Sequence, residues 1–354
     1  MSDGGDVFLA DYLRSSRKKV VFIIVMTIAA VGAVLLTLGF GVYTISIPDA
    51  ISVFWNHVTG QVSWVKADHY VWDVRFPRAL GALVVGAGLA FAGAIMQNDM
   101  RNPLAEPYTM GIASGAFLGA VLSLVLGFSL IPGLSGDWAT VINAFVFSVI
   151  PTVVIMIVSQ FRKMTPTAMI LVGIALLFLF SSISQVLMVT APAETLADAY
   201  NWRVGTLSKV TWDNLPIMAA IVAAICIPLY FLSSKLDVMY LGDRAASTLG
   251  VNANRLRLIT MLLVSLMTGA VVSFTGTIGF IGLVGPHVAR ILVGSKNRYL
   301  LPASAAFGAA FLILADTLAK VCGPSGLPVG VISAMVGGPL FIYILVRQKK
   351  SAWA

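Results

Sequence analysis

Ten separate apolar segments, each roughly 16 to 23 residues long, constrain the fold of this chain more than any other feature. A helix needs about 20 apolar residues to cross the hydrocarbon core of a bilayer. Charged residues make up 11% of the 354-residue chain, against roughly 25% in soluble domains, so they are too few to cover a soluble surface. The sequence therefore predicts an all-α polytopic membrane protein, a single transmembrane domain over residues 1–354 with ten transmembrane helices. The predicted spans are residues 20–42, 79–96, 109–131, 139–158, 168–189, 215–232, 256–274, 278–293, 300–318 and 329–346.

The distribution of basic residues predicts how these spans are oriented. Of the 23 Lys and Arg residues, 17 fall in loops on the side of the N-terminus and six fall on the other side. Cytoplasmic loops carry the excess of Lys and Arg in membrane proteins, so both termini are predicted to be cytoplasmic, in a plasma or inner cell membrane. Because the charges are spread over short loops and form no single patch, they argue against a nucleic-acid partner.

The division between the seventh and eighth spans rests on the short run 274–277, which contains no charge. A count of nine spans would place Arg290, Lys296 and Arg298 outside, against the positive-inside bias. The ten-span topology is therefore preferred. It leaves two long outer segments, 44–73 and 191–214, and the second is expected to hold a short helix across the mouth of a central pathway.

Residues 233–257 form a polar segment between two strongly apolar ones, on the predicted cytoplasmic side. The pattern predicts two short helices, the first capped by Asp237, with Gly250 ending a helix and Asn252 capping the next. Apolar residues spaced by three, four and four positions predict one apolar stripe. They are Val238, Leu241, Ala245 and Leu249. This stripe could lie on lipid or in a groove of another protein, and an ordinary solvated loop is an equally good interpretation.

The motifs of enzymes and metal sites are missing from the sequence. It contains no phosphate-binding GxxxxGK[ST] loop and no HExxH, and its three histidines are scattered. His287 is interpreted as a structural histidine. The two cysteines, Cys226 and Cys322, lie far apart and predict neither a disulfide nor a metal site. We therefore expect no catalytic residue, no metal and no cofactor bound by this chain.

Polar residues inside spans usually face a cavity or another helix. The fifth span carries Ser181, Ser184 and Gln185 on one face, where lining a pathway and bonding a neighbouring helix are equally good interpretations. Asp316 and Lys320 are expected to form an exposed pair near the outer end of the ninth span. With Arg75 and Arg78 they place positive charge on the outer face, which suggests an acidic partner or contact with lipid headgroups.

Five ordered motifs resemble the FecCD family, the permease subunits of type II ABC importers for ferric siderophores, haem and cobalamin. The motifs are RFPR at 75–78, GAIMQ with NPLAEP at 93–107, LGD with LG at 241–250, IGFIGLV with PH at 278–287, and LPVG at 327–330. The resemblance implies the type II importer fold, with ten spans per subunit. It also implies the partners: a second copy of the chain, two ATPase subunits that bind ATP and Mg, and an extracytoplasmic substrate-binding protein.

The resemblance also implies roles for particular residues. The coupling element that docks in the ATPase would comprise Leu241, Gly242, Asp243, Arg244, Ala245, Ala246, Leu249, Gly250 and Val251. The residues that engage acidic side chains of the binding protein would be Arg75, Arg78 and Lys320. The pathway at the dimer axis would be lined by Ser181, Ser184 and Gln185. The inner gate, in the loop 161–167, would comprise Arg162, Lys163, Met164 and Thr165.

The sequence therefore predicts a permease subunit that imports an iron chelate, a ferric siderophore or haem, and performs no covalent chemistry itself. A cobalamin permease of the same family is the first alternative, because all these permeases share the motifs. A proton-coupled secondary transporter is a second, but it needs buried carboxylates in mid-span, and only Asp316 comes near. An intramembrane enzyme is a third, and the missing motifs argue against it.

Overall fold

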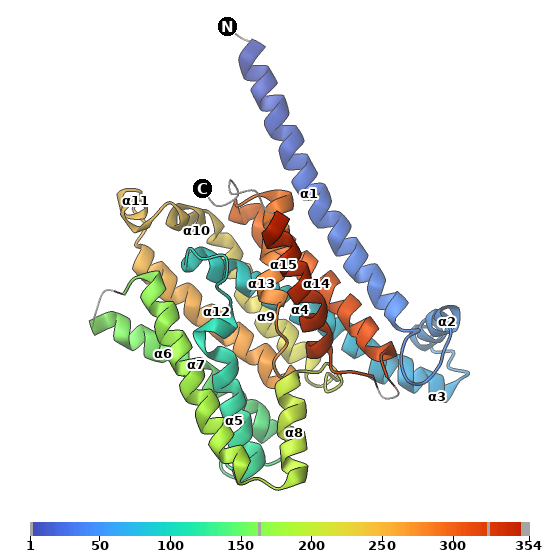
Figure 1. Ribbon diagram of the computed structural model, residues 1–354. Helices are drawn as coiled ribbons and strands as arrows, with labels where there is room; N and C mark the ends of the chain where they lie inside the picture. The colour runs from blue at the N-terminus through green and yellow to red at the C-terminus, as the bar shows by residue number, and fades with distance from the viewer. Residues whose placement is uncertain (1–2, 162–163, 324–325, 348–354) are drawn as a thin grey trace.

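The structure is a computed structural model that describes residues 3–161, 164–323 and 326–347, and within these ranges every regular element is a helix (Figure 1). The all-α prediction is therefore confirmed. The helices are α1 Asp3–Thr37, α2 Ile47–Val58, α3 Val65–Asp68, η1 His69–Arg75, α4 Phe76–Asp99, η2 Pro107–Met110, α5 Ile112–Leu126, α6 Asp137–Phe161, α7 Pro166–Val189, α8 Ala193–Val204, α9 Leu215–Phe231, α10 Ser233–Tyr240, α11 Asp243–Thr248, α12 Ala253–Thr275, α13 Ile281–Val293, α14 Asn297–Val321 and α15 Val329–Arg347.

Each of the ten predicted apolar segments coincides with a helix, but the helix lengths do not establish ten crossings. Seven helices are long and apolar enough to span a membrane, and the bent pair α9 and α10 would make an eighth. The helices α5 and α13 are shorter. The third predicted span, 109–131, is longer than α5 because Gly111 and Gly127, both with positive φ, stand at either end of that helix.

The predicted break between the seventh and eighth spans is confirmed. Helix α12 ends at Thr275, and Gly276 follows with a φ of 68°. Phe280 then takes a left-handed φ of 69° immediately before α13, which is unusual for a residue that carries a Cβ. These two residues reverse the chain without any charged side chain, which explains why the sequence marks the break so weakly.

Helix α4 is the central element of the fold, and 18 of its residues are buried, from Pro77 to Asp99. It packs against α14, α13, α12 and α9. Small residues bring the backbones together: a Cβ added at Gly86 would lie 2.8 Å from the Gly308 carbonyl carbon on α14. Such contacts are typical of helix packing in membranes, where van der Waals fit replaces the hydrophobic effect.

Helix α4 continues, toward the predicted outer end, into the π-helical η1 and then α3, so the second span runs without interruption from Val65 to Asp99. Helix α2 lies beside this extension, beyond the end of α1 (Figure 1). Ser46 caps α2, because its Oγ accepts a hydrogen bond from the Asp49 N–H at 3.3 Å. Aromatic side chains fill the contact, with Phe54 4.9 Å from Phe76 and 5.7 Å from Trp72.

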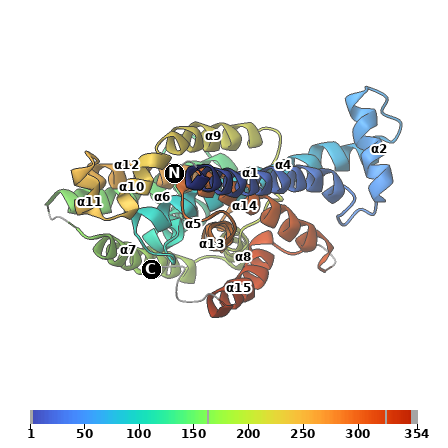
Figure 2. The same ribbon diagram turned by 90° about the horizontal axis from the view of Figure 1, so that it is seen from above.

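Helices α1, α7 and α15 are among those that leave large apolar side chains exposed. Helix α1 packs mainly on α14 and exposes Val21 and Ile28, as a helix facing lipid does. Helices α7 and α15 lie along the edge of the molecule opposite α9 (Figure 2). They expose Phe178 on α7 and Ile342 on α15, among others. These faces are open to lipid or to another protein.

Candidate functional site

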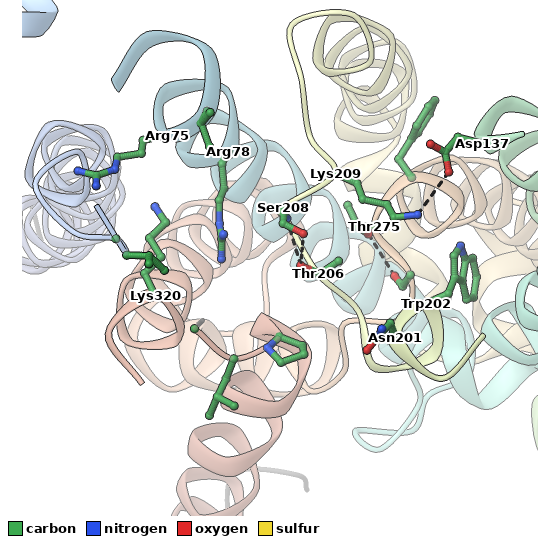
Figure 3. A pocket seen from close by; sticks show the side chains of 18 of the residues that line it. Arg75, Arg78, Asp137, Asn201, Trp202, Thr206, Ser208, Lys209, Thr275 and Lys320 are labelled. Carbon is green, nitrogen blue, oxygen red and sulfur yellow. Dashed lines mark hydrogen bonds and ion pairs between the residues drawn. The ribbon is translucent and has the colours of Figure 1, made fainter. Parts of the chain in front are cut away.

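A cavity of about 600 Å³ lies at the predicted outer end, between α8 and the loop that follows α1 (Figure 3). Its charged lining residues are Arg75, Arg78, Asp137, Asp198, Lys209 and Lys320. The helix expected within residues 191–214 is α8, and its residues Asn201 and Trp202 line the same cavity. The three basic residues predicted to dock a binding protein are therefore gathered at one place, together with Lys209.

Arg75 lines the cavity, but most of its side chain is buried against the loop that follows α1. It is buried, and its Nη1 donates a hydrogen bond to the Leu38 carbonyl at 2.6 Å while its Nη2 donates to the Tyr43 carbonyl. Both carbonyls belong to the segment after α1. Carbonyl groups at the end of a helix have no partner within the helix, and the Arg75 guanidinium supplies hydrogen-bond donors there. In this structure Arg75 fixes the end of α1 against η1, and its predicted docking role stays a prediction.

Asp316 and Lys320 form the predicted ion pair, but the prediction that it is exposed is wrong. Helix α14 packs between α1 and α4, and both side chains are buried there. The Asp316 carboxylate is fully buried and accepts from Lys320 Nζ at 3.0 Å and from Arg78 Nη2 at 2.8 Å. Lys320 also donates to the Thr37 hydroxyl at 3.1 Å. One carboxylate thus serves two cations, which leaves a net positive charge beside the cavity.

Arg78 is the member of this cluster that remains open to the cavity. Its side chain is 17% exposed, whereas that of Lys320 is 4% exposed. Figure 3 shows Arg78 reaching between Lys320 and the segment that carries Ser208. Lys209 lies on the far side of the cavity, 3.4 Å from Asp137 in an exposed pair. A docking role for Arg78 stays a prediction, and the cation that accompanies it on the open surface is Lys209.

The predicted cytoplasmic hairpin is present at the opposite end of the molecule as α10 and α11 (Figure 1). Asp237 does not cap the first helix, since α10 begins at Ser233 and Asp237 lies within it. Its carboxylate instead accepts from the backbone N–H and the side-chain amide of Asn297, at 2.8 and 2.7 Å. The predicted caps that follow are confirmed: Gly250 has a φ of 77°, and the Asn252 side chain accepts from the Arg255 N–H at 3.0 Å.

The apolar stripe of this hairpin is not continuous. Gly242, with a φ of 111°, separates α10 from α11, so the predicted stripe is divided between two helices. Ala246 is buried, whereas Leu241 and Leu249 are 67% and 60% exposed. The two leucines stand at either end of α11, and Arg244 on that helix is exposed as well. This short helix therefore presents two apolar side chains that nothing in the described chain covers.

Asp243, the first residue of α11, is held by two arginines that the sequence did not single out. Arg101 lies 2.5 Å and Arg257 2.8 Å from the same carboxylate oxygen. Partial burial raises the pKa of Asp243, but the hydrogen bond and charge of Arg257, with the charge of Arg101, outweigh it and hold the pKa below its usual value. Asp243 is therefore ionised at neutral pH.

The three polar residues of α7 do not share one environment. Ser184 is fully buried and donates to the Phe180 carbonyl of its own helix at 2.8 Å. Ser181 is half-buried and Gln185 is exposed. In this structure Ser184 bonds its own helix, while Gln185 lies on the exposed apolar face of α7. The pathway roles of Ser181, Ser184 and Gln185 remain predictions.

The predicted inner gate is described only in part, because Arg162 and Lys163 lie outside the described residues. Met164 is half-buried, and its sulfur accepts from the Ser159 hydroxyl at 3.4 Å. Thr165 caps α7 by accepting from the Ala168 N–H at 3.2 Å. Met164 therefore contacts the end of α6, and Thr165 is the N-cap of α7.

Glu106 is a half-buried carboxylate that the sequence reasoning overlooked as a titratable group. It precedes η2, and the carboxylate lies next to Gly282, in the first turn of α13. Within the described chain no basic side chain forms an ion pair with it, and burial raises its pKa to about 7. The neighbouring Tyr108 hydroxyl donates to the Ile278 carbonyl at 3.1 Å and accepts from the Ile278 N–H at 3.2 Å. The signal was available, because Glu106 falls within the NPLAEP motif.

The structure is thus a polytopic helical bundle with a charged cavity at one end and a projecting helical hairpin at the other, and the comparison with known families identifies its class as a transport permease. A model of the FecCD transport family matches residues 26–347, nearly the whole chain. The chain belongs to this family.

Individual relatives agree with that assignment. An ABC transporter permease of Methanocaldococcus jannaschii is 36% identical over 348 residues, 96% of this chain and 98% of that protein. The hemin transport system permease of Yersinia pestis is 36% identical over 298 residues, 84% of this chain and 87% of the relative. Among solved structures, one described as an inward-facing metal-chelate type ABC transporter has a TM-score of 0.82 and 27% identity, covering 92% of this chain and 99% of that one.

Proposed function

We propose that this chain is the membrane-spanning subunit of an ATP-driven ABC importer that takes up an iron chelate, either a ferric siderophore or haem. The observation that carries the proposal is α11, a short helix flanked by two exposed leucines, Leu241 and Leu249, which could enter a groove on another protein. Family membership indicates that the other protein is an ATPase subunit. The chelate class is supported by the names of the hemin permease and of the metal-chelate transporter.

The remaining partners follow from the exposed faces. A second copy would pack against the apolar faces of α7 and α15, and each copy would offer one hairpin to one ATPase subunit. The two ATPase subunits would bind ATP and Mg. With both termini in the cytoplasm, the cation-lined cavity would face outward, where Arg78 and Lys209 would meet acidic side chains of a substrate-binding protein. Complementary charges of this kind orient a partner and raise the rate of association.

The test places a charge on the exposed leucine of the hairpin. Leu249→Asp should prevent the ATPase from copurifying with the permease and abolish uptake, because the carboxylate would have to be desolvated on docking. Val58→Asp is the matched control, since Val58 is 55% exposed on α2 near the predicted outer end. Copurification of the ATPase with the Leu249→Asp permease at the wild-type ratio would refute the docking assignment.

Glu106 favours a second candidate function, proton-coupled transport, because it is a half-buried carboxylate whose pKa lies near physiological pH. That function needs no ATPase. Uptake by the permease alone in liposomes, driven by a pH gradient without ATP, would support it. Uptake that requires the ATPase and ATP at every imposed gradient would leave the ABC importer as the function. Offering a ferric siderophore, hemin and cobalamin in the same assay would identify the substrate.

A further inference from the structure

A buried guanidinium connects the hairpin to the transmembrane helices. Arg257, on the second turn of α12, is fully buried. Its Nη2 lies 2.8 Å and its Nη1 3.5 Å from the two carboxylate oxygens of Asp243 on α11. Its Nε donates to the Asp99 carbonyl, the last residue of α4, at 2.9 Å. A single planar side chain therefore joins three helices.

Two further contacts reinforce this junction. Arg101, in the loop directly after α4, lies 2.5 Å from the Asp243 carboxylate. The Asp99 side chain accepts from the Thr260 hydroxyl of α12 at 2.6 Å. The end of α4 is thus bonded to α12 as well as to α11. We call these five residues, Asp99, Arg101, Asp243, Arg257 and Thr260, the Asp243 node.

Helix α11 has little else to hold it. It is six residues long, and Ala246 is its one buried residue. Within the described part of the chain, the ion pairs that α11 makes are those of Asp243. A helix attached at so few points would move independently of the bundle when a partner displaces Leu241 or Leu249. The node prevents this if it transmits the displacement of α11 to α4 and α12.

The helices that meet at the node both reach the outer cavity. Helix α4 has 24 residues and α12 has 23, so each is about 35 Å long at 1.5 Å per residue. Arg78 lies at the far end of α4 and Thr275 at the far end of α12, and both line the cavity. Two rigid helices therefore connect the node directly to the opposite end of the molecule.

We propose that Arg257 is a positioning residue that makes α11, α4 and α12 move as one unit, so that displacement of the hairpin by an ATPase reaches the outer cavity. The inference rests on the proposed function. Lysine keeps the positive charge but lacks the planar fork that bonds Asp243 and the Asp99 carbonyl together. Arg257→Lys should therefore leave the hairpin able to dock and loosen its attachment to α4 and α12.

The test uses the complete complex of permease, ATPase and binding protein in liposomes, and measures ATP hydrolysed per chelate imported. Arg257→Lys should retain basal ATP hydrolysis and a normal ATPase content, while the ratio of ATP to chelate rises on the order of tenfold. Arg255→Lys is the matched control, because Arg255 lies two residues away on α12 and is exposed. Its ratio should equal that of the wild type.

Two outcomes would overturn the proposal. An unchanged ratio in Arg257→Lys would show that the node transmits nothing. Loss of the ATPase from the complex would show that Arg257 serves only to shape the docking surface. If Arg257→Lys does not insert stably, Arg101→Gln replaces it, because the Arg101 side chain is 33% exposed and is not needed to fill the core. It should give a smaller rise in the ratio, and no rise would equally refute the node.

The failure of the proposed function would look different. In that case the wild-type complex itself would show no ATP-driven uptake, whatever the state of the node. A wild-type complex with ATP-driven uptake, beside an Arg257→Lys complex that hydrolyses more ATP per chelate imported, would support the proposed function and the role of the node separately.

Discussion

Replacing Gly93 by alanine tests the close packing at the centre of the molecule. Gly93 lies on α4 against Gly282 on α13. A Cβ added there would overlap the Gly282 carbonyl oxygen and would lie 2.5 Å from the carbonyl carbon and 2.7 Å from the Cα of Gly282. Ordinary van der Waals contact begins at 3.4 Å, so α4 and α13 would have to separate by more than about 1 Å. Both neighbours are backbone atoms, and no side-chain rotation can relieve the overlap.

The cost can be estimated from overpacking in other protein cores. Inserting a methyl group into a well-packed core costs about 1–3 kcal/mol, and the absence of a movable side chain places this site at ~3 kcal/mol. An unfolding entropy of about 2.1 cal/mol/K per residue gives ~0.7 kcal/mol/K for a chain of this length. Gly93→Ala should therefore lower the Tm of the purified permease by roughly 4 °C.

The assay is thermal unfolding of the detergent-purified protein, read by intrinsic fluorescence. Gly32→Ala is the matched control, since Gly32 lies in α1 and has nothing within 4 Å of an added Cβ. Alanine is the better helix former, so this control should keep or slightly raise the Tm. A Tm for Gly93→Ala equal to that of Gly32→Ala would refute the argument that backbone contact requires glycine at position 93.

Three further predictions concern charged and exposed residues. Asp316→Asn leaves Arg78 and Lys320 without their shared carboxylate, so it should destabilise the protein by about 3–5 kcal/mol in the same thermal assay, and a change below ~1 kcal/mol would contradict the buried cluster. Glu106 has a pKa raised to about 7, above the ~4.3 of an unfolded chain, so stability should fall as pH rises from ~4.3 to ~7. Glu106→Gln should remove that slope in a series of melts, and an unchanged slope would assign it to other groups. Gln185→Cys, in a background without native cysteines, should react with a water-soluble maleimide in at least one nucleotide state, and protection in every state would exclude it from the pathway.

Local sequence patterns predicted the helices well, because apolar length and flanking breakers act over a few residues. The break at Gly276 and the cap at Asn252 are both where the sequence placed them. The length of the third span was not predicted correctly, because Gly111 and Gly127 stand inside an apolar run that looks continuous. The discontinuous stripe has the same cause, since the positive φ of Gly242 interrupts a spacing that fits one helix.

Contacts between distant segments could not be predicted. The sequence identified Arg75 and Lys320 as basic residues on the outer side, but their burial depends on where the end of α1 and the side of α14 lie. Likewise, the polar composition located the hairpin, whereas nothing in the sequence connects Asp243 with Arg101, 142 residues before it. The sequence therefore predicted which residues belong to the candidate site. Only the fold shows which of their side chains are exposed and which are buried in contacts with other segments.

The packing of α1 on α14 has a consequence for the order of synthesis. Helix α1 ends at Thr37, and the Thr37 hydroxyl accepts a hydrogen bond from the Lys320 ammonium on α14. The ribosome makes Lys320 some 280 residues after Thr37. At about 5–20 residues per second, α1 waits in the membrane for roughly 15–60 seconds before α14 emerges. Arg75 can be satisfied much sooner, because Leu38 and Tyr43 precede it in the nascent chain. The contact between η1 and the loop after α1 can therefore form early, while the ion cluster around Asp316 forms among the last contacts of the nascent permease.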